Sequence, residues 1–431
     1  MAIKVCDAIM GSGKTSAIIN MMNNHPEKKY LYITPFLTET DRIVENCPNI
    51  DFISPSKQWK YHLNKQAHLQ ELIKEDRNIS ITQALFTMST EETISLIKEH
   101  NYTVIIDESV DVFKPLTIQE SDYNLVKRAG LITEYDAEQS MYSVESNGYT
   151  TGKLQDFFTL ARSNRIVKIR NSSDSDTAYY WQLPKELFEV SEDIYILTYM
   201  FDCQSLRYYF DLNHIEYEYV YIYVDENNTY SFSDELKYMP EYVSHLSSMI
   251  HVFENDKLND IGKNKNALSS SWYDRALTHK SDGKIEQLRK NVANFFTHYM
   301  KGVPASGRLW STFKKGTGAI RTKGFYNSNI EYNCKATNAY SDKKVLAYCV
   351  NIFMHPDIKN YFLQRNIDVD EDAQALSTML QWIWRSAIRN GEEIWVYVPS
   401  KRMRNLLKDW IKNTQQLYYT TLESKEVSAI A

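Results

Sequence analysis

One short stretch near the amino terminus restricts the fold of this chain more than any other. Residues 8–15 read Ala-Ile-Met-Gly-Ser-Gly-Lys-Thr, which fits the phosphate-binding loop pattern with Ala in place of the first glycine. The apolar residues Ile3, Val5 and Cys6 before it predict a buried strand, and residues 15–24 after it predict a helix with an apolar inner side. Strand, glycine loop and helix are the context that such a loop requires.

The residue types of the loop suit the charge of nucleotide phosphates. The backbone N–H groups of Gly11, Ser12 and Gly13 would point at the phosphates, next to the positive end of the helix dipole. Lys14 would reach the β- and γ-phosphates, and the Thr15 hydroxyl would hold Mg²⁺. The alternative interpretation is a glycine turn in an ordinary βα unit.

The composition of the chain limits the classes of protein to which it can belong. The chain has 431 residues, of which 43% are hydrophobic and 24% charged, and this is typical of a globular protein with two or three domains. It has no signal-peptide pattern and no apolar run of the roughly 18 residues that cross a membrane. Its five cysteines form no CxxC pair, which disfavours a zinc ribbon or an iron–sulfur cluster and favours reduced thiols in a cytoplasm. The net charge of −6 excludes a surface that is basic throughout but permits a local basic groove.

The first half of the chain alternates between strand and helix patterns. After the loop, apolar runs predict further buried strands at residues 30–33, 52–53, 79–81, 104–106 and 195–199. Repeated βα units imply a parallel, doubly wound sheet. Ligands of such sheets bind at the carboxyl ends of strands, so Thr34, Thr82 and Asp107, which each follow a strand, are expected to face one crevice.

Asp107 and Glu108 form the second anchor of the predicted site. A hydrophobic strand that ends in two acids is a Walker B pattern, although alone it is often a solvated turn. In a chain with a phosphate loop, Asp107 would hold the Mg²⁺ ion that Thr15 also touches. Glu108 would orient and polarise the attacking water.

Domain boundaries follow from the places where the alternation stops and resumes. A first domain is expected over residues 1–224, with residues 110–190 as an insertion that is either a lid or wedge or a decorated loop. Residues 225–265 are polar and are predicted to be an irregular linker. Residues 266–415 are predicted to form a second α/β domain, with strands at 309–313, 345–351 and 394–398 and helices at 283–300, 374–389 and 401–412. Residues 416–431 are expected to be a polar tail.

These residues together resemble a superfamily 2 helicase of the DExx type, in the small form carried by phages and prophages. In chain order, Ala8–Thr15 resembles motif I, Thr34-Pro35 motif Ia, Thr82-Gln83 motif Ib, Asp107-Glu108-Ser109 motif II, Leu197-Thr198 motif III, Trp310-Ser311-Thr312 motif IV, Ala336-Thr337-Asn338 motif V, and residues 381–389 motif VI. The resemblance implies an α/β fold with two RecA-like parallel-sheet domains in tandem and an insertion in the first. It also implies ATP and Mg²⁺ as cofactors and Thr198 as a coupling residue.

The chain departs from the helicase pattern in its last motif. Trp384 stands where glycine usually precedes the first arginine, and Arg385 and Arg389 are spaced so that both would lie on one face of a helix. The resemblance implies that Arg385 or Arg389 completes the ATP site from the second domain and that Gln381 contacts the γ-phosphate or the water. A solvated helix face is the alternative interpretation of the two arginines.

A basic stretch predicts where a nucleic-acid strand would bind. Between Gln287 and Ile330 there is no Asp or Glu, while cations and aromatic residues alternate. Cations follow phosphates and aromatic faces stack on bases, although a core strand with basic flanks would give a similar pattern. The expected nucleic-acid contacts, from this stretch and from motifs Ia, Ib, IV and V, are Thr34, Pro35, Thr82, Gln83, Trp310, Thr312, Lys314, Lys315, Arg321, Lys323, Thr337 and Asn338.

The sequence therefore predicts an ATP hydrolase that moves on a nucleic-acid strand. Its expected partners are single-stranded or forked DNA, with RNA possible, and replication or recombination proteins of a phage in the host cytoplasm. A terminase-like packaging ATPase is one alternative, but its nuclease would need separated carboxylates, and Asp368, Asp370, Glu371 and Asp372 are clustered. A nucleotide-gated DNA-binding protein with little turnover is another.

Overall fold

The computed structural model describes residues 2–56, 64–116, 118–136, 141–143, 154–162, 165–170, 177–235, 240–334 and 339–430. The chain divides into two compact units. The first holds residues 1–8, 12–236 and 355–369, and the second holds residues 9–11, 237–354 and 370–431. Among the described helices, none is both long and apolar enough to cross a membrane.

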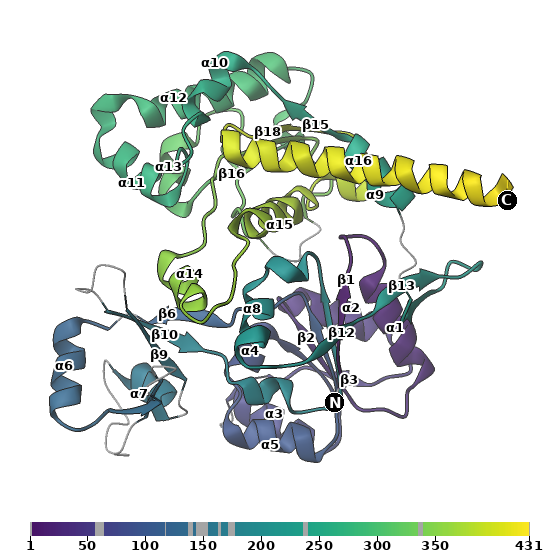
Figure 1. Ribbon diagram of the computed structural model, residues 1–431, viewed down its shortest axis with the longest axis vertical. Helices are drawn as coiled ribbons and strands as arrows, with labels where there is room; N and C mark the ends of the chain where they lie inside the picture. The colour runs from purple at the N-terminus through teal and green to yellow at the C-terminus, as the bar shows by residue number, and fades with distance from the viewer. Residues whose placement is uncertain are drawn as a thin grey trace. The chain divides into compact units, whose positions relative to one another are not determined.

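A seven-stranded parallel sheet forms the centre of the first unit, in the order β12-β1-β11-β5-β2-β4-β3. The strands are β1 (Ala2–Asp7), β2 (Tyr30–Thr34), β3 (Phe52–Ile53), β4 (Asn78–Thr82), β5 (Thr103–Asp107), β11 (Asp193–Thr198) and β12 (Tyr217–Tyr219). Strands with consecutive apolar residues are typical of a sheet covered on both faces. The helices of this unit are α1 (Lys14–Asn24), α2 (Leu37–Asn46), α3 (Lys65–Lys74), α4 (Gln83–Thr87), α5 (Glu91–Glu99) and α8 (Ser205–Leu212) (Figure 1).

The inner side of α1 is buried against this sheet. Ala17, Ile18 and Met22 are fully buried among side chains of β1, β2, β5 and β11. This apolar stripe packs α1 on one face of the sheet. The loop joins the carboxyl end of β1 to the start of α1, so it lies at the edge where parallel sheets of this kind bind ligands.

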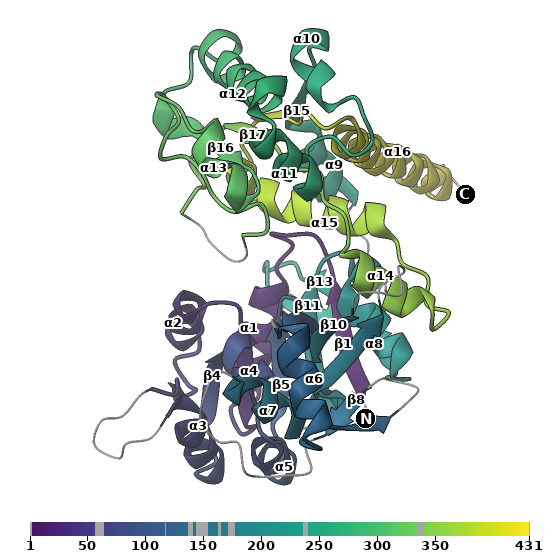
Figure 2. The same cartoon turned by 90° about the vertical axis from the view of Figure 1, so that its left-hand side faces the viewer.

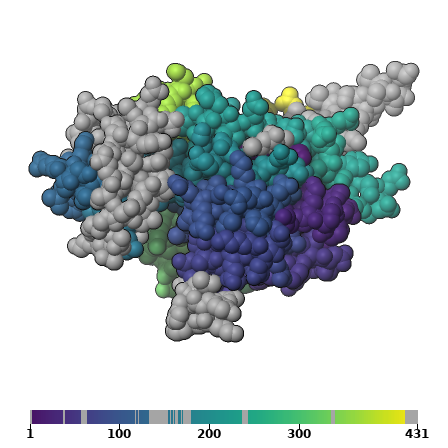
Figure 3. Space-filling model, turned by 90° about the horizontal axis from the view of Figure 1, so that it is seen from below, coloured from purple at the N-terminus to yellow at the C-terminus, as the bar shows by residue number. Residues whose placement is uncertain are grey.

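The predicted insertion has its own sheet and core. Five antiparallel strands follow the order β6-β10-β9-β8-β7. The elements are β6 (Phe113–Leu116), α6 (Glu120–Arg128), β7 (Thr133–Asp136), β8 (Met141–Ser143), α7 (Gln155–Arg162), β9 (Ile166–Arg170) and β10 (Thr177–Gln182). The insertion lies at one side of the first unit, where α6 is visible in the space-filling view (Figure 3). It is a folded subdomain rather than a decorated loop.

A helix from the second half of the chain belongs to the first unit. Helix α14 (Pro356–Leu363) packs against the base of the insertion, where the rings of Phe362 and Phe113 lie 5.6 Å apart. The Tyr180 hydroxyl on β10 donates to Asp357 at 3.1 Å and lies 3.1 Å from Nδ1 of His355. No local sequence pattern predicts this packing.

The second unit is built on a smaller parallel sheet in the order β15-β18-β17-β16. Its strands are β15 (Ile250–Phe253), β16 (Arg308–Ser311), β17 (Val345–Tyr348) and β18 (Ile394–Tyr397). Its helices are α9 (Pro240–Ser248), α10 (Asp256–Asn259), α11 (Ser270–Thr278), α12 (Lys284–Asn294), α13 (Thr317–Ile320), α15 (Glu371–Ile383) and α16 (Lys401–Ile430) (Figure 2). The expected α/β fold class, with two parallel sheets and an insertion in the first domain, is confirmed.

Two parts of the predicted chain layout differ from the structure. Residues 225–265 are not irregular, because they contain α9, β15, α10 and the strand β14 (Tyr230–Ser233), which pairs with β13 (Tyr221–Val224) in a hairpin of the first unit. Strand β15 was missed because His251 interrupts a very short apolar run. Helix α16 continues to Ile430 over the expected polar tail.

Candidate functional site

The phosphate loop has the backbone conformation that its glycines predict. Gly11 and Gly13 have φ angles of 80° and 94°, in the left-handed region that side chains rarely adopt. Helix α1 begins directly after them at Lys14. The first N–H groups of a helix have no partner within it, so they are available to an anion. The Ser12 hydroxyl is buried and has no hydrogen-bond partner among the described residues, as expected of a group that awaits a ligand.

Lys14 lies among the acids that the sequence placed at strand ends. Its ammonium group donates to the carbonyl of Ala8 within the loop. Burial lowers the pKa of Lys14, while the charges of nearby Asp107, Asp7 and Glu108 oppose this shift. The cation expected at the phosphates and the acids expected at the metal and the water are therefore close together in space.

Asp107 ends β5 and is held by a tyrosine that the sequence did not indicate. The Tyr32 hydroxyl on β2 donates to Oδ2 of Asp107 at 2.7 Å. Burial raises the pKa of Asp107 to about 6, although the Tyr32 hydrogen bond acts in the opposite direction. A buried carboxylate whose ionised form is disfavoured suits a cation, and hydroxyl and carboxylate oxygens are ligands that Mg²⁺ prefers. Thr15 and Asp107 thus fit the Mg²⁺ ion that the loop implies.

Glu108 has a strained backbone that the surrounding chain holds in place. Its φ of 64° lies in the left-handed region, which costs free energy for a residue with a side chain. Its N–H donates to the carbonyl of Leu197 at 2.9 Å, and its own carbonyl accepts from Nε2 of Gln83 at 2.7 Å. Gln83 also donates to the carbonyl of Asp107 at 3.1 Å. The predicted nucleic-acid contact Gln83 therefore fixes the turn that carries both acids.

A second turn joins the loop to the end of β11. The N–H groups of Met200 and Phe201 donate to the two carboxylate oxygens of Asp7, at 2.7 and 2.8 Å. The Thr198 carbonyl accepts from the Ala8 N–H at 3.0 Å. The Thr198 hydroxyl contacts the side-chain amide of Gln204, at 2.7 Å from Nε2 and 3.1 Å from Oε1. Thr198, predicted as the coupling residue, thus links the loop to α8. The sequence patterns did not predict Asp7 or Gln204 as residues of this site.

The two arginines expected on one helix face are not on one helix. Helix α15 ends at Ile383, and Ser386 is extended, with φ −88° and ψ −170°, before a short 3₁₀ turn. The Ser386 hydroxyl donates to the Ile383 carbonyl at 2.6 Å and so caps the end of the helix. Arg385 is buried with 5% of its surface exposed, whereas Arg389 is exposed. The prediction of a shared face was wrong. Gln381, the third expected residue, is half-buried on α15 with its Nε2 3.4 Å from the Ser377 hydroxyl.

Several expected nucleic-acid contacts are core residues. Trp310 has no exposed surface and donates its ring N–H to the Phe325 carbonyl at 2.9 Å, so it cannot stack on a base. Thr34 and Thr312 are also buried, at 0% and 2% exposed. For Trp310 and Thr312, the core strand with basic flanks was the correct alternative. Thr82 is half-buried and caps helix α4 through the Leu85 N–H.

The remaining expected contacts are at least partly exposed or cannot be placed. Lys314 and Lys323 are exposed and have no ion-pair partner among the described residues. Lys315 is exposed but pairs with Asp274 at 2.7 Å. Arg321 stacks on Tyr326, with its guanidinium carbon 4.3 Å from the ring centroid. Pro35 is half-buried, and Thr337 and Asn338 lie outside the described residues.

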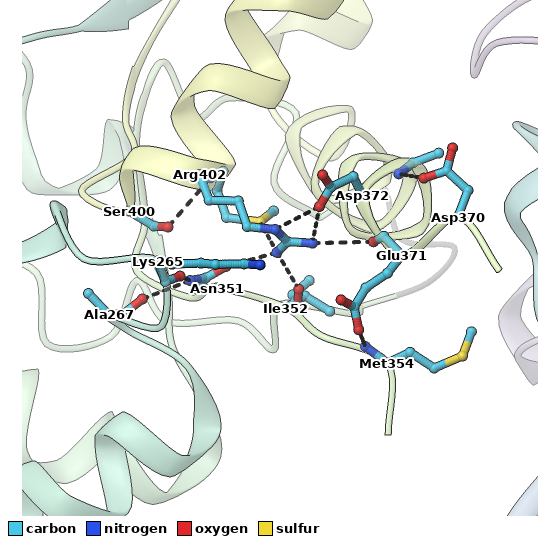
Figure 4. Close-up of polar contacts among 12 residues, drawn as sticks. Lys265, Ala267, Asn351, Ile352, Met354, Asp370, Glu371, Asp372, Ser400 and Arg402 are labelled. Atoms are coloured by element: carbon cyan, nitrogen blue, oxygen red, sulfur yellow. Dashed lines mark hydrogen bonds and ion pairs between the residues drawn. The ribbon is translucent and has the colours of Figure 1, made fainter. Parts of the chain in front are cut away.

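The carboxyl edge of the second sheet holds a polar network that is complete in itself (Figure 4). Arg402, at the start of α16, donates to Asp372 at 2.7 Å and to Oδ1 of Asn351 at 2.9 Å. Asn351, which follows β17, donates in turn to the carbonyls of Lys265 and Ala267 at 2.8 and 2.9 Å. These side chains hold the loops of the second unit together.

Two solved structures are similar to the chain over most of its length. Xpd4 of S. tokodaii has a TM-score of 0.42 and 11% identity, over 95% of this chain and 93% of that one. The DUF1998 helicase MrfA, crystallised with DNA and AMPPNP, has a TM-score of 0.33 and 12% identity, over 96% of this chain and 48% of that one.

The sequence comparisons are closer. The model of the YonV C-terminal Rossmann-like domain matches residues 244–411. The SPbeta prophage-derived uncharacterized protein YonV of Bacillus subtilis strain 168 is 38% identical over 422 residues, which cover 95% of this chain and 99% of that protein. Because this identity extends over nearly the whole of both proteins, the chain belongs to the YonV family.

Proposed function

We propose that this protein is an ATP hydrolase that couples hydrolysis to movement along a nucleic-acid strand, as a helicase or translocase. One observation carries the proposal. Lys14 of a glycine loop lies among Asp7, Asp107 and Glu108 at the carboxyl edge of a parallel sheet. A cation, a metal-binding carboxylate and a second acid at a helix N-terminus are the parts that phosphoryl transfer requires.

Each residue of the loop has a role that its surroundings support. Backbone N–H groups at the start of α1 would bind the phosphates, and Lys14 would leave the Ala8 carbonyl to neutralise the β- and γ-phosphates. Thr15 and Asp107 would hold Mg²⁺, which when bound neutralises charge on the phosphate oxygens. Glu108 would accept a proton from the attacking water, since it follows Asp107 on a turn whose backbone is held by Leu197 and Gln83.

The second unit would contribute an arginine to the same reaction. We favour Arg389 over Arg385, since Arg389 is exposed and Arg385 is buried. Gln381 would contact the γ-phosphate or the water. Thr198 and Gln204 would couple conformational changes of the loop to α8, because Thr198 contacts Ala8 of the loop and Gln204 at the start of α8.

Nucleic acid would bind through the exposed basic residues of the second unit. Lys314, Lys323 and the stacked pair of Arg321 and Tyr326 offer two cations for phosphates and one preformed stack for a base. Single-stranded or forked DNA is the expected substrate, with RNA as the alternative. The prophage origin in the name of the B. subtilis relative supports a role in phage replication or recombination.

The deciding experiment is the ATPase rate with and without single-stranded DNA or RNA. Wild type is expected to bind ATP and to be stimulated at least several-fold by a strand. Lys14→Ala should abolish nucleotide binding, whereas Arg389→Ala should bind ATP normally and lose most turnover. Matched controls are Lys98→Ala and Arg275→Ala, which remove exposed cations of the first and second unit that have no proposed role.

Clear ATP binding with stimulation below about twofold would contradict translocation and favour the nucleotide-gated binding protein. Metal-dependent cleavage of plasmid DNA would favour the packaging ATPase. A strand-displacement assay with either overhang then gives the polarity, for which the helicase resemblance implies 3′ to 5′.

A further inference from the structure

The hairpin β13–β14 brings an aromatic ring against the phosphate loop. The loop residue Gly13 has so little space beside it that a Cβ atom there would lie 2.1 Å from Cδ1 of Tyr230. Tyr230 begins β14, and its carbonyl accepts from Nδ2 of Asn20 on α1 at 3.1 Å. The half-buried ring is therefore in van der Waals contact with the backbone that would hold the phosphates.

The order of strands determines which part of a nucleotide this ring would meet. Asp107 and Glu108 end β5, which is separated from β1 by β11. The hairpin follows β12, on the opposite side of β1. The γ-phosphate must lie toward the two acids, so the ribose and base leave the loop in the other direction, toward the hairpin.

We propose that Tyr230 is the residue against which the ribose and base of the bound nucleotide lie. This inference rests on the proposed function, because it assumes that the loop holds a nucleoside triphosphate. An aromatic face stacks on any base without reading its hydrogen-bonding edge, so the contact adds affinity for a nucleoside but little selectivity among bases.

The Tyr230 ring packs against the core beneath α1, but it is not the only contact that holds the hairpin. The bond from Asn20 is made to the backbone of Tyr230. Further along the strand, Phe232 stacks on Tyr195 with ring centroids 5.6 Å apart. The turn is closed by Asp225, which accepts from the N–H groups of Asn227 and Thr229. Replacement of the ring should therefore leave the hairpin folded, which makes the contact testable by mutation.

The test compares ligands with and without a nucleoside, by calorimetry or fluorescence competition on the full chain. The ligands are ATP, ADP, GTP and inorganic tripolyphosphate, each with Mg²⁺. The variants are Tyr230→Leu, which keeps apolar bulk, Tyr230→Phe, which keeps the ring, and Lys14→Ala. We expect Tyr230→Leu to lower the affinity for ATP, ADP and GTP about tenfold, because stacking on one aromatic ring contributes that much to binding. The affinity for tripolyphosphate should not change. Tyr230→Phe should behave as wild type.

The outcomes separate this inference from the proposed function. If wild type binds neither ATP nor tripolyphosphate, the proposed function fails and the inference fails with it. If Lys14→Ala abolishes binding while Tyr230→Leu binds ATP as wild type does, only the inference is wrong. If Tyr230→Leu lowers the affinity for ATP and the affinity for tripolyphosphate equally, the ring only supports the loop, and the inference is also overturned.

Discussion

The two parallel sheets end in polar residues of very different kinds. At the edge of the first sheet, burial lowers the pKa of Lys14 and raises that of Asp107 to about 6, and the Ser12 hydroxyl has no partner among the described residues. At the edge of the second sheet, Arg402 and Asn351 donate to acceptors that lie within the same unit. The first edge carries charges that the protein itself does not stabilise well, whereas the second is satisfied internally.

This difference is consistent with the binding site proposed at the first edge and with a structural network at the second. A buried polar network stabilises a fold when every donor and acceptor is satisfied, and it costs stability when they are not. At the edge of the first sheet, a charged ligand of the kind proposed above would offset this cost, whereas the polar groups at the second edge are paired with one another. Mutations at the first edge should change binding or turnover, and mutations at the second should change stability.

The largest effect is expected for Glu108→Gln. This change removes the proposed proton acceptor but keeps the size of the side chain, so turnover of ATP should fall by about 100-fold or more. ATP affinity should change little, because Lys14 and Asp107 remain. Steady-state ATPase rates and ATP binding measure the two quantities. Asp111→Asn, at an exposed acid shortly after the turn, is the control and should have no effect. Retained turnover in Glu108→Gln would exclude Glu108 as the base.

Arg402→Ala should act on stability. The change leaves Oδ1 of the buried Asn351 without its donor and removes the contact with Asp372, so the free energy of unfolding should fall by about 2–4 kcal/mol. The midpoint of urea denaturation gives the change. Lys408→Ala on the same helix removes an exposed ion pair with Glu254 and should cost less than about 1 kcal/mol. If both variants cost the same, the network at the second edge contributes little.

Asp107→Asn should stabilise the ligand-free protein at neutral pH. The folded carboxyl has a pKa of about 6, above its unfolded value, so the folded state binds the proton more tightly and stability falls as pH rises from about 4 to 6. Removing the charge should raise the free energy of unfolding by at most about 3 kcal/mol at pH 7.5 and should not change it near pH 4. Urea denaturation at the two pH values without nucleotide tests this. The variant should also lose the stabilisation that Mg²⁺ and ATP give to wild type. If wild type is more stable than Asp107→Asn at pH 7.5 without ligand, the prediction is wrong.

The smallest effect distinguishes two neighbouring lysines. Each phosphate contact made to single-stranded nucleic acid contributes about −0.7 to the slope of log affinity against log salt. Lys314→Ala should reduce this slope by about 0.7, whereas Lys315→Ala should reduce it less, because Lys315 already pairs with Asp274. Strand affinity over a range of salt concentrations measures both. A larger change for Lys315→Ala would place the strand on the other side of this turn.

Short-range patterns predicted the elements around the proposed site well. The loop, the strand before it and α1 are contiguous, and the apolar run before Asp107 is long enough to predict a buried strand. Partners that are distant in the sequence could not be predicted in the same way. Asp7 accepts from Met200 and Phe201, and Tyr230 contacts Gly13, yet no local pattern marks these pairs.

The structure of the second unit was predicted less well, because its local sequence patterns are compatible with more than one structure. Trp384 and Arg385 continue the helical pattern of α15, so only the structure shows that the helix ends at Ile383 and that the backbone of Ser386 is extended. Aromatic residues beside cations predicted a strand-binding groove, but Trp310 fills the core and its ring N–H is satisfied by the Phe325 carbonyl. Burial depends on tertiary packing, which composition does not reveal.

The docking of α14 has a consequence for synthesis of the chain. Tyr361 and Phe362, at 1% and 0% exposed, belong to the first unit although they follow β17 of the second. A ribosome adds residues in order, so the first unit lacks this helix until more than a hundred further residues of the chain have been made. During that interval Phe113, which packs against both rings, is without these two partners. Neither unit is a contiguous segment, and a gene cut between them would leave the first without part of its core.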